Sequence, residues 1–86
     1  MKIKQKNISE IYLNCRRGML ELDLILLIFL EKHYNRLNNK LKVKFILLLN
    51  ESDNLIYNLL IKNIYNKKYF QIINKIKKTT TLIKFS

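Results

Sequence analysis

The sequence has little of several residues that mark common functional sites: no proline, no tryptophan, one glycine and one cysteine among 86 residues. A single glycine excludes a glycine-rich phosphate-binding loop and argues against a dinucleotide-binding fold. A single cysteine excludes an internal disulfide, which favours a reducing compartment, and we expect a cytoplasmic protein. Because there is only one cysteine and one histidine, we expect no metal site within one chain and no cofactor held by it.

Long apolar runs and acidic residues are scarce as well. The longest uncharged apolar stretch, residues 24–30, is much shorter than the ~20 residues that span a bilayer. Glu21 and Asp23 precede it, where a signal peptide would carry basic residues, so we expect neither a membrane span nor a targeting segment. The formal net charge is +11, and all six acidic residues lie between Glu10 and Asp53. Such a charge favours encounter with acidic proteins, nucleic acid or anionic membranes, although the abundance of Lys, Asn, Ile, Tyr and Phe is also typical of an AT-rich coding sequence.

Apolar residues recur at helical spacing in several segments, and no alternating pattern or hairpin turn occurs. We therefore predict an all-α fold with helices at about 8–15, 19–35 and 40–50, a short one after Ser52-Asp53, and a last one after 63–66. The second is apolar on nearly every side, which predicts a buried central helix. The expected organisation is one small domain at 8–78, between a basic tail at 1–7 and a loose tail at 79–86.

The rare residues gather in one segment, Cys-Arg-Arg-Gly-Met-Leu-Glu-Leu-Asp at positions 15–23. Two of the three arginines stand side by side here, and guanidinium binds a carboxylate or phosphate through two parallel hydrogen bonds as lysine does not. Gly18 permits a positive φ angle or close approach of another backbone. Glu21 and Asp23 place negative charge at a helix start, where the dipole favours it.

This segment resembles the Arg-Gly-x-x-Glu signature of the FAD assembly factor SdhE family, the flavinylation factors of succinate dehydrogenase. The family form Arg-Arg-Gly-Met-x-Glu-Leu-Asp is matched at every specified position of 16–23, and a looser likeness extends from about residue 8 to about 78. The chain departs from the family in lacking tryptophan, for which Tyr12 substitutes in the first helix. The resemblance implies a compact five-helix bundle.

The resemblance also implies a function. Members bind the flavoprotein subunit of succinate dehydrogenase, and of fumarate reductase in some cases, and promote covalent attachment of FAD to that client without being enzymes. By this likeness Arg16 and Arg17 grip the client, Gly18 allows close approach, Glu21 orients an arginine or accepts client donors, and Asp23 fixes the helix start. The implied protein is a monomer with no catalytic residue of its own.

Each of these residues also has a plain structural explanation. Arg17 and Glu21 are four residues apart and can form a helix-surface ion pair of about 0.2–0.5 kcal/mol, Gly18 can be a simple helix junction, and Glu21 a first-turn carboxylate. Cys15 fits the apolar face of the first helix, although the adjacent arginines can lower a thiol pKa. His33 has no nucleophile or second ligand near it in sequence, so we interpret it as a surface residue.

The basic C-terminal half leaves a second possibility open. Its aromatic residues lie among lysines and can be either base-stacking groups or core residues, and we favour the core (Tyr57, Tyr65, Tyr69 and Phe70). Two alternatives to the assembly factor therefore remain: a small nucleic-acid-binding protein, or an antitoxin-like partner of a membrane-associated toxin, a role that the family resemblance also brings.

Overall fold

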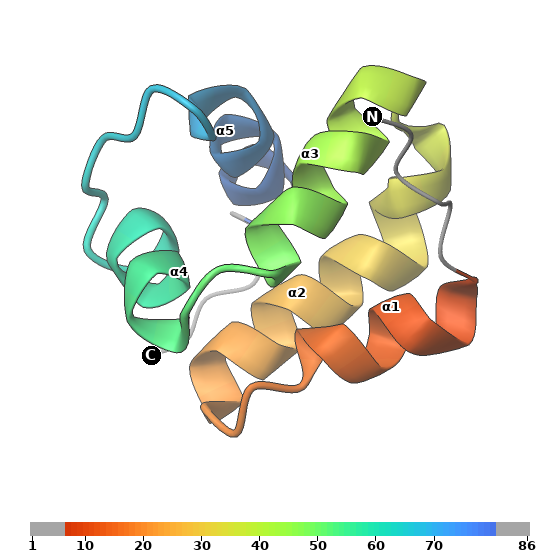
Figure 1. Cartoon of the computed structure of the whole chain (residues 1–86), viewed down its shortest axis with the longest axis horizontal. Coiled ribbons are helices and arrows are strands. Elements are labelled where there is room, and N and C mark those ends of the chain that lie inside the picture. The colour runs from red at the N-terminus through yellow and green to blue at the C-terminus, as the bar shows by residue number, and fades with distance from the viewer. Residues whose placement is uncertain (1–6, 81–86) are drawn as a thin grey trace.

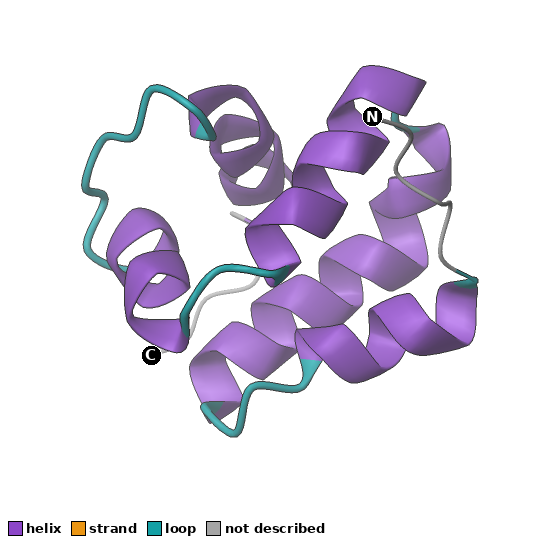
Figure 2. Ribbon diagram, in the orientation of Figure 1, coloured by secondary structure: helices purple, strands orange, loops and turns teal. Residues whose placement is uncertain are grey.

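The computed structural model describes residues 7–80. It contains helices and connecting turns, with no strand in that range, and confirms the predicted all-α fold with five helices (Figure 2). The elements are α1 (Ile8–Cys15), α2 (Leu20–His33), the 3-10 helix η1 (Tyr34–Arg36), α3 (Asn39–Leu49), α4 (Asp53–Leu60) and α5 (Phe70–Thr80).

Three of the helices begin at polar side chains that accept a hydrogen bond from a free backbone N–H group. The Asn7 side chain accepts from the N–H of Glu10 at the start of α1. The Ser52 side chain accepts from the N–H of Leu55 at the start of α4, and the Asn38 side chain accepts from that of Leu41 at the start of α3. These caps explain how a chain with no proline still sets its helix boundaries sharply.

Helix α2 is the centre of the bundle. Figure 1 shows it crossing the molecule diagonally with α1 alongside, and it contacts α1, η1, α4 and α5. Its inward stripe is buried to 7% exposure or less, at Leu22, Ile25, Leu26, Phe29 and Leu30. The predicted burial does not extend over its whole surface, because Leu20 is 76% exposed and Leu24 is exposed as well.

The core lies between α2 and the inward faces of the other helices. Its aromatic centre is Phe29 against Phe45, with ring centroids 5.3 Å apart, and Tyr34 packs on Phe45 at 5.7 Å. Tyr69, immediately before α5, is 1% exposed, and its hydroxyl donates to the Glu51 carboxylate at 2.5 Å. Burial, followed by the hydrogen bond and the charge of Glu51, raises the pKa of Tyr69.

The helix ends differ from the sequence prediction at three places. The second helix changes to a 3-10 turn after His33. The last helix runs to Thr80, so the first two residues of the predicted 79–86 tail are helical. Asn7 belongs to the α1 cap rather than to the predicted basic tail. The remaining tail residues, 1–6 and 81–86, lie outside the described part of the chain. Within that part, no helix is long and apolar enough to cross a bilayer.

Candidate functional site

Residues 16–23, here called the motif segment, form the connection between α1 and α2 together with the first turn of α2. Helix α1 ends at Cys15, and Gly18 then takes a φ of 84°, the left-handed conformation that glycine adopts without strain. The Asp23 carboxylate reaches back to accept hydrogen bonds from the backbone N–H groups of Arg17, at 2.6 Å, and Gly18, at 3.3 Å. Asp23 therefore fixes the turn and the start of α2.

The Arg17 side chain is turned into the protein. Its Nε donates to Asp53 Oδ1 at 2.7 Å, its Nη1 to the carbonyl oxygens of Asn14 and Leu49, and its Nη2 to that of Glu51 at 2.8 Å. The side chain is 15% exposed, and that of Asp53 is 46% exposed. A planar fork with several donors satisfies this set of acceptors, which a lysine cannot do. Arg17 thus ties the motif segment to the turn between α3 and α4.

Four residues of the motif segment face solvent, whereas Leu22 is buried in the core and Met19 is half-buried. Arg16, Gly18, Leu20 and Glu21 are all exposed. No atom lies within 4 Å of the position that a Cβ on Gly18 would occupy, so this glycine is required by its φ angle and leaves open space above it. The segment therefore presents a cation, a bare backbone, an apolar group and a carboxylate on a turn whose shape is held from within.

Cys15 adjoins this turn from the inside. It is fully buried, and its Sγ lies 3.9 Å from the Leu26 carbonyl oxygen in the neighbouring helix. Burial raises the pKa of the thiol to about 12, outweighing the Arg17 guanidinium, which lowers it. The predicted place of Cys15 on the apolar face of α1 is confirmed, and an activated thiolate is not present.

The structure corrects two expectations for the motif segment. Arg16 and Arg17 do not form an outward pair, because only Arg16 is exposed. Arg17 bonds with Asp53, 36 residues away, in place of the nearby Glu21. Sequence reasoning assigned Asp53 only to a turn, and it missed the exposed Leu20, although this leucine occupies the one unspecified position of the signature.

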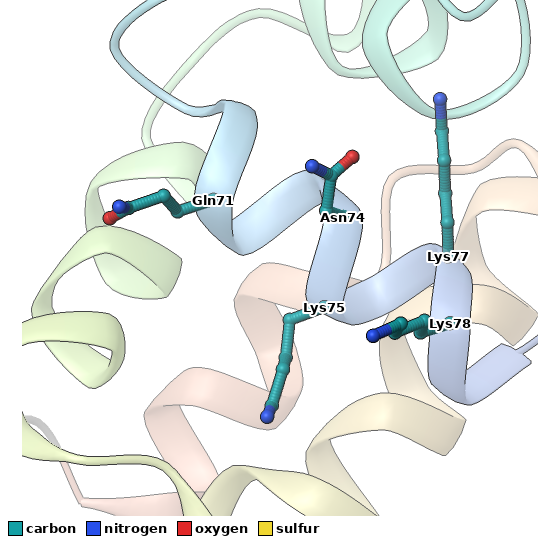
Figure 3. Close-up of a pocket in the computed structure, with 5 residues that line it drawn as sticks. All are labelled: Gln71, Asn74, Lys75, Lys77 and Lys78. Atoms are coloured by element: carbon teal, nitrogen blue, oxygen red, sulfur yellow. The ribbon is translucent and has the colours of Figure 1, made fainter.

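The basic C-terminal half holds a second candidate surface. Figure 3 shows the polar side chains that line a hollow of about 460 Å³ on α5, with Lys75 and Lys77 pointing in opposite directions. The predicted core role is right for Tyr69, which is buried, and Tyr57 is half-buried. It is wrong for Tyr65 and Phe70, which are exposed and pair with ring centroids 5.9 Å apart.

The remaining candidates have structural surroundings. His33 is half-buried at the end of α2, with its ring 5.8 Å from that of Phe29, so it is less exposed than the surface residue that the sequence predicted. Over residues 7–80, no three histidine, cysteine or carboxylate side chains lie close enough together to hold a metal ion. The feature that distinguishes this small helical protein is a turn that is held from inside by hydrogen bonds and carries both charged and apolar groups on its outer face.

Comparison with known proteins identifies the family. The family described as flavinator of succinate dehydrogenase matches residues 10–80, and the chain belongs to it. The FAD assembly factor SdhE of Wigglesworthia glossinidia brevipalpis is 45% identical over 82 residues, covering 93% of this chain and 95% of that protein. The FAD assembly factor SdhE of Pectobacterium atrosepticum is 40% identical over 57 residues, 66% of this chain and 65% of that protein. No solved structure matches the chain significantly. The resemblance drawn from the motif segment is thereby confirmed.

Proposed function

We propose that this chain is an assembly factor that binds the flavoprotein subunit of succinate dehydrogenase in the cytoplasm and promotes covalent attachment of FAD to it. Fumarate reductase has a related subunit and is a second candidate client. Family membership supports the general role, and the geometry of the motif segment supports a docking role for its outer face. In this proposal the flavin bonds to a histidine of the client, and the chain supplies no catalytic group and holds no cofactor.

The observation that carries the proposal is that some side chains of the motif segment hold the turn while others are exposed to a partner. Arg17 and Asp23 hold the turn through hydrogen bonds to side-chain and backbone groups. Arg16, Gly18 and Glu21 are then presented in one arrangement before any partner arrives. A pre-organised surface loses less conformational entropy on binding, so more of the contact energy is available to hold the client.

The sequence-based roles are refined accordingly. Arg16 and Glu21 make charged contacts with the client, Gly18 admits its backbone, and the exposed Leu20 adds apolar contact area. Arg17 and Asp23, which the sequence placed in the same binding group, act by shaping the turn. Binding that favours one client conformation shifts the client toward the geometry in which the flavin and its histidine react.

The test is covalent flavin on a co-produced client. Arg16→Ala and Glu21→Ala alter exposed side chains, so the helical circular-dichroism signal should stay unchanged while the fluorescence of flavin bound to the denatured client falls. Lys40→Ala, also an exposed residue but outside the motif segment, is the matched control and should label the client normally. Normal labelling by the Arg16→Ala and Glu21→Ala double variant would refute the assigned surface.

A further inference from the structure

The large apolar side chains that are exposed in the described part of the chain fall into two groups. The first lies on α1 and α2, on and beyond the motif segment, and comprises Ile8, Tyr12, Leu13, Leu20 and Leu24. The second lies at the other side of the molecule, in the connection between α4 and α5 and at the first residue of α5, and comprises Ile64, Tyr65 and Phe70. The proposed client docking surface does not use the second group.

The connection from 61 to 69, here called the α4–α5 loop, bulges away from the body of the bundle at the left of Figure 1. Ile64 is 51% exposed and Tyr65 is 71% exposed. The Tyr65 ring packs against that of Phe70, and behind both lies a shallow hollow of about 120 Å³. The loop therefore carries an outward-facing apolar tip.

Hydrogen bonds hold both ends of this loop. Ile64 N–H donates to the Asn58 carbonyl at 3.0 Å, and Asn63 takes a φ of 59° while its side-chain oxygen accepts from Lys77 Nζ. On the far side, Asn66 Oδ1 accepts from the N–H groups of Lys68 and Tyr69. The backbone of Ile64 and Tyr65 is thus fixed between two anchored asparagines, and their exposure is built into the loop.

The surroundings of the tip are basic. Lys62, Lys67 and Lys68 are exposed on the loop itself, and no acidic residue follows Asp53 in the sequence. The Nζ atoms of Lys62 and Lys68 lie over the rings of Tyr57 and Tyr69, at 6.0 and 5.2 Å from the ring centroids, so these two cations stay close to the loop. An apolar tip flanked in the chain by lysines is complementary to the surface of an anionic bilayer, whose headgroups attract the cations while the interface accepts aromatic and aliphatic groups.

We propose that the α4–α5 loop binds the surface of membranes that contain anionic lipid. Ile64 and Tyr65 enter the interfacial region, and Lys62, Lys67 and Lys68 contact lipid phosphates. Nucleic acid fits the tip less well, because an isoleucine side chain has no ring on which a base can stack. The arginines that commonly read bases are also absent after Arg36.

The test uses the full chain and phospholipid vesicles. Vesicles of phosphatidylcholine with phosphatidylglycerol should carry the protein in a flotation assay, and vesicles of phosphatidylcholine alone should not. The Ile64→Ser and Tyr65→Ser double variant should bind about tenfold more weakly, since it removes the apolar groups that enter the interface. Lys62→Gln with Lys67→Gln should weaken binding by about fivefold per lysine at low salt.

Two matched controls lie outside the α4–α5 loop. Tyr12→Ser with Leu13→Ser removes an exposed tyrosine and an exposed aliphatic residue from α1, and Lys32→Gln with Lys40→Gln removes two exposed lysines elsewhere. Both controls should stay within about twofold of the parent chain, since neither touches the loop. Equal losses in the two lysine pairs would mean general charge attraction, and equal losses in the two apolar pairs would mean apolar attraction that is not specific to the loop; either result would overturn the proposal.

A second measurement reports the tip directly. Because the chain has no tryptophan, Tyr65→Trp introduces a single tryptophan at the loop, which can be excited apart from the tyrosines, and Tyr12→Trp gives the equivalent probe on α1. Emission from position 65 alone should shift to shorter wavelength on adding anionic vesicles. Absence of that shift, or a shift with a single-stranded oligonucleotide and none with vesicles, contradicts membrane binding and in the latter case assigns the tip to nucleic acid.

Discussion

Arg16 and Arg17 are adjacent in the chain, and the fold gives them opposite surroundings. Arg16 is exposed, whereas every nitrogen of the Arg17 guanidinium donates a hydrogen bond within the protein. Removing Arg17 leaves the carbonyl oxygens of Leu49 and Glu51 without this donor. Loss of Arg17 should therefore lower the stability of the chain, whereas loss of Arg16 should weaken client binding and leave the stability unchanged.

We predict that Arg17→Ala lowers the free energy of unfolding by about 3 kcal/mol. This is at the low end of the loss for buried ion pairs, because Asp53 is partly exposed. Arg17→Lys should cost about half as much, since one ammonium group cannot reach all four acceptors. Urea denaturation followed by circular dichroism measures both. Arg16→Ala is the control, with an expected change within about 0.5 kcal/mol. Equal losses at the two positions contradict the bracing role.

Cys15 provides a prediction about pH. Burial raises its pKa in the folded chain to about 12, above the ordinary thiol value of 9.0. The unfolded chain therefore releases the thiol proton at lower pH, so stability from this residue is complete below about pH 9 and is lost as the pH rises toward 12. At pH 8 a thiol reagent should label native Cys15 only as fast as the chain unfolds.

The labelling control is Ser9→Cys, which places a second thiol at an exposed position in α1. Native protein should then react rapidly with one equivalent of reagent, and addition of urea should expose the second. Rapid modification of Cys15 in the native parent chain would contradict its burial.

At the scale of single residues, the sequence predicted those features that depend on residue type and on spacing within one helix. The positive φ of Gly18 follows from the residue type, and the place of Cys15 on the apolar face of α1 follows from helical spacing. The inward turn of the Arg17 side chain could not be predicted in this way, because three of its four acceptors come from residues 32 to 36 positions later in the chain. Helical spacing predicted Glu21 as the partner of Arg17, whereas in the folded chain Arg17 bonds with the distant Asp53.

The connection between α1 and α2 is the element that depends most on one residue. Gly18→Ala meets no steric contact, yet it forces a side chain into the left-handed region and should cost about 1–2 kcal/mol. Gly18→Asn should cost less, because asparagine tolerates that conformation. Comparing the urea midpoints of the two variants tests whether φ alone requires the glycine. Equal destabilisation by the two variants would show that the positive φ angle is not the reason why glycine is required at this position.

Asp23 gives a second prediction for the same element. Its carboxylate accepts from two backbone N–H groups, so Asp23→Ala leaves both unpaired and should cost about 1–2 kcal/mol. Flavin attachment to the client should fall further than the folded fraction does, because the turn that presents Arg16 and Glu21 loses its pre-organised shape. Glu21→Ala is the contrasting variant, with full stability and reduced attachment. Normal attachment by folded Asp23→Ala would show that the client surface does not depend on this turn being held in advance.

The order of the helices was predictable because apolar spacing and polar caps mark each one. It was harder to predict which face of each helix is buried. Helix α2 is apolar on nearly every side, yet Leu20 and Leu24 are exposed because only four elements, α1, η1, α4 and α5, make extensive contact with it. A sequence pattern shows which residues avoid water, and the packing of the other helices decides which of them are covered.

On the scale of the whole molecule, the turn between α3 and α4 is the place where distant parts meet. The Glu51 backbone carbonyl accepts from Arg17 of the motif segment, and its carboxylate accepts from the Tyr69 hydroxyl at the start of α5. One residue thus links the proposed client surface to the last helix. A chain of contacts of this kind can transmit a disturbance at one end to the other.

This arrangement predicts energetic coupling between Arg17 and Tyr69, which are not bonded to each other. Tyr69→Phe removes the hydroxyl and should cost about 1 kcal/mol. Combined with Arg17→Lys, the loss should differ from the sum of the single losses by about 0.5–1 kcal/mol, because each variant frees the same turn to relax. Arg17→Lys with Asn38→Ala, at the distant start of α3, is the control pair and should be additive within about 0.5 kcal/mol. Additivity in both pairs would show that Glu51 carries two independent contacts, and that the motif segment keeps its shape whatever happens at α5.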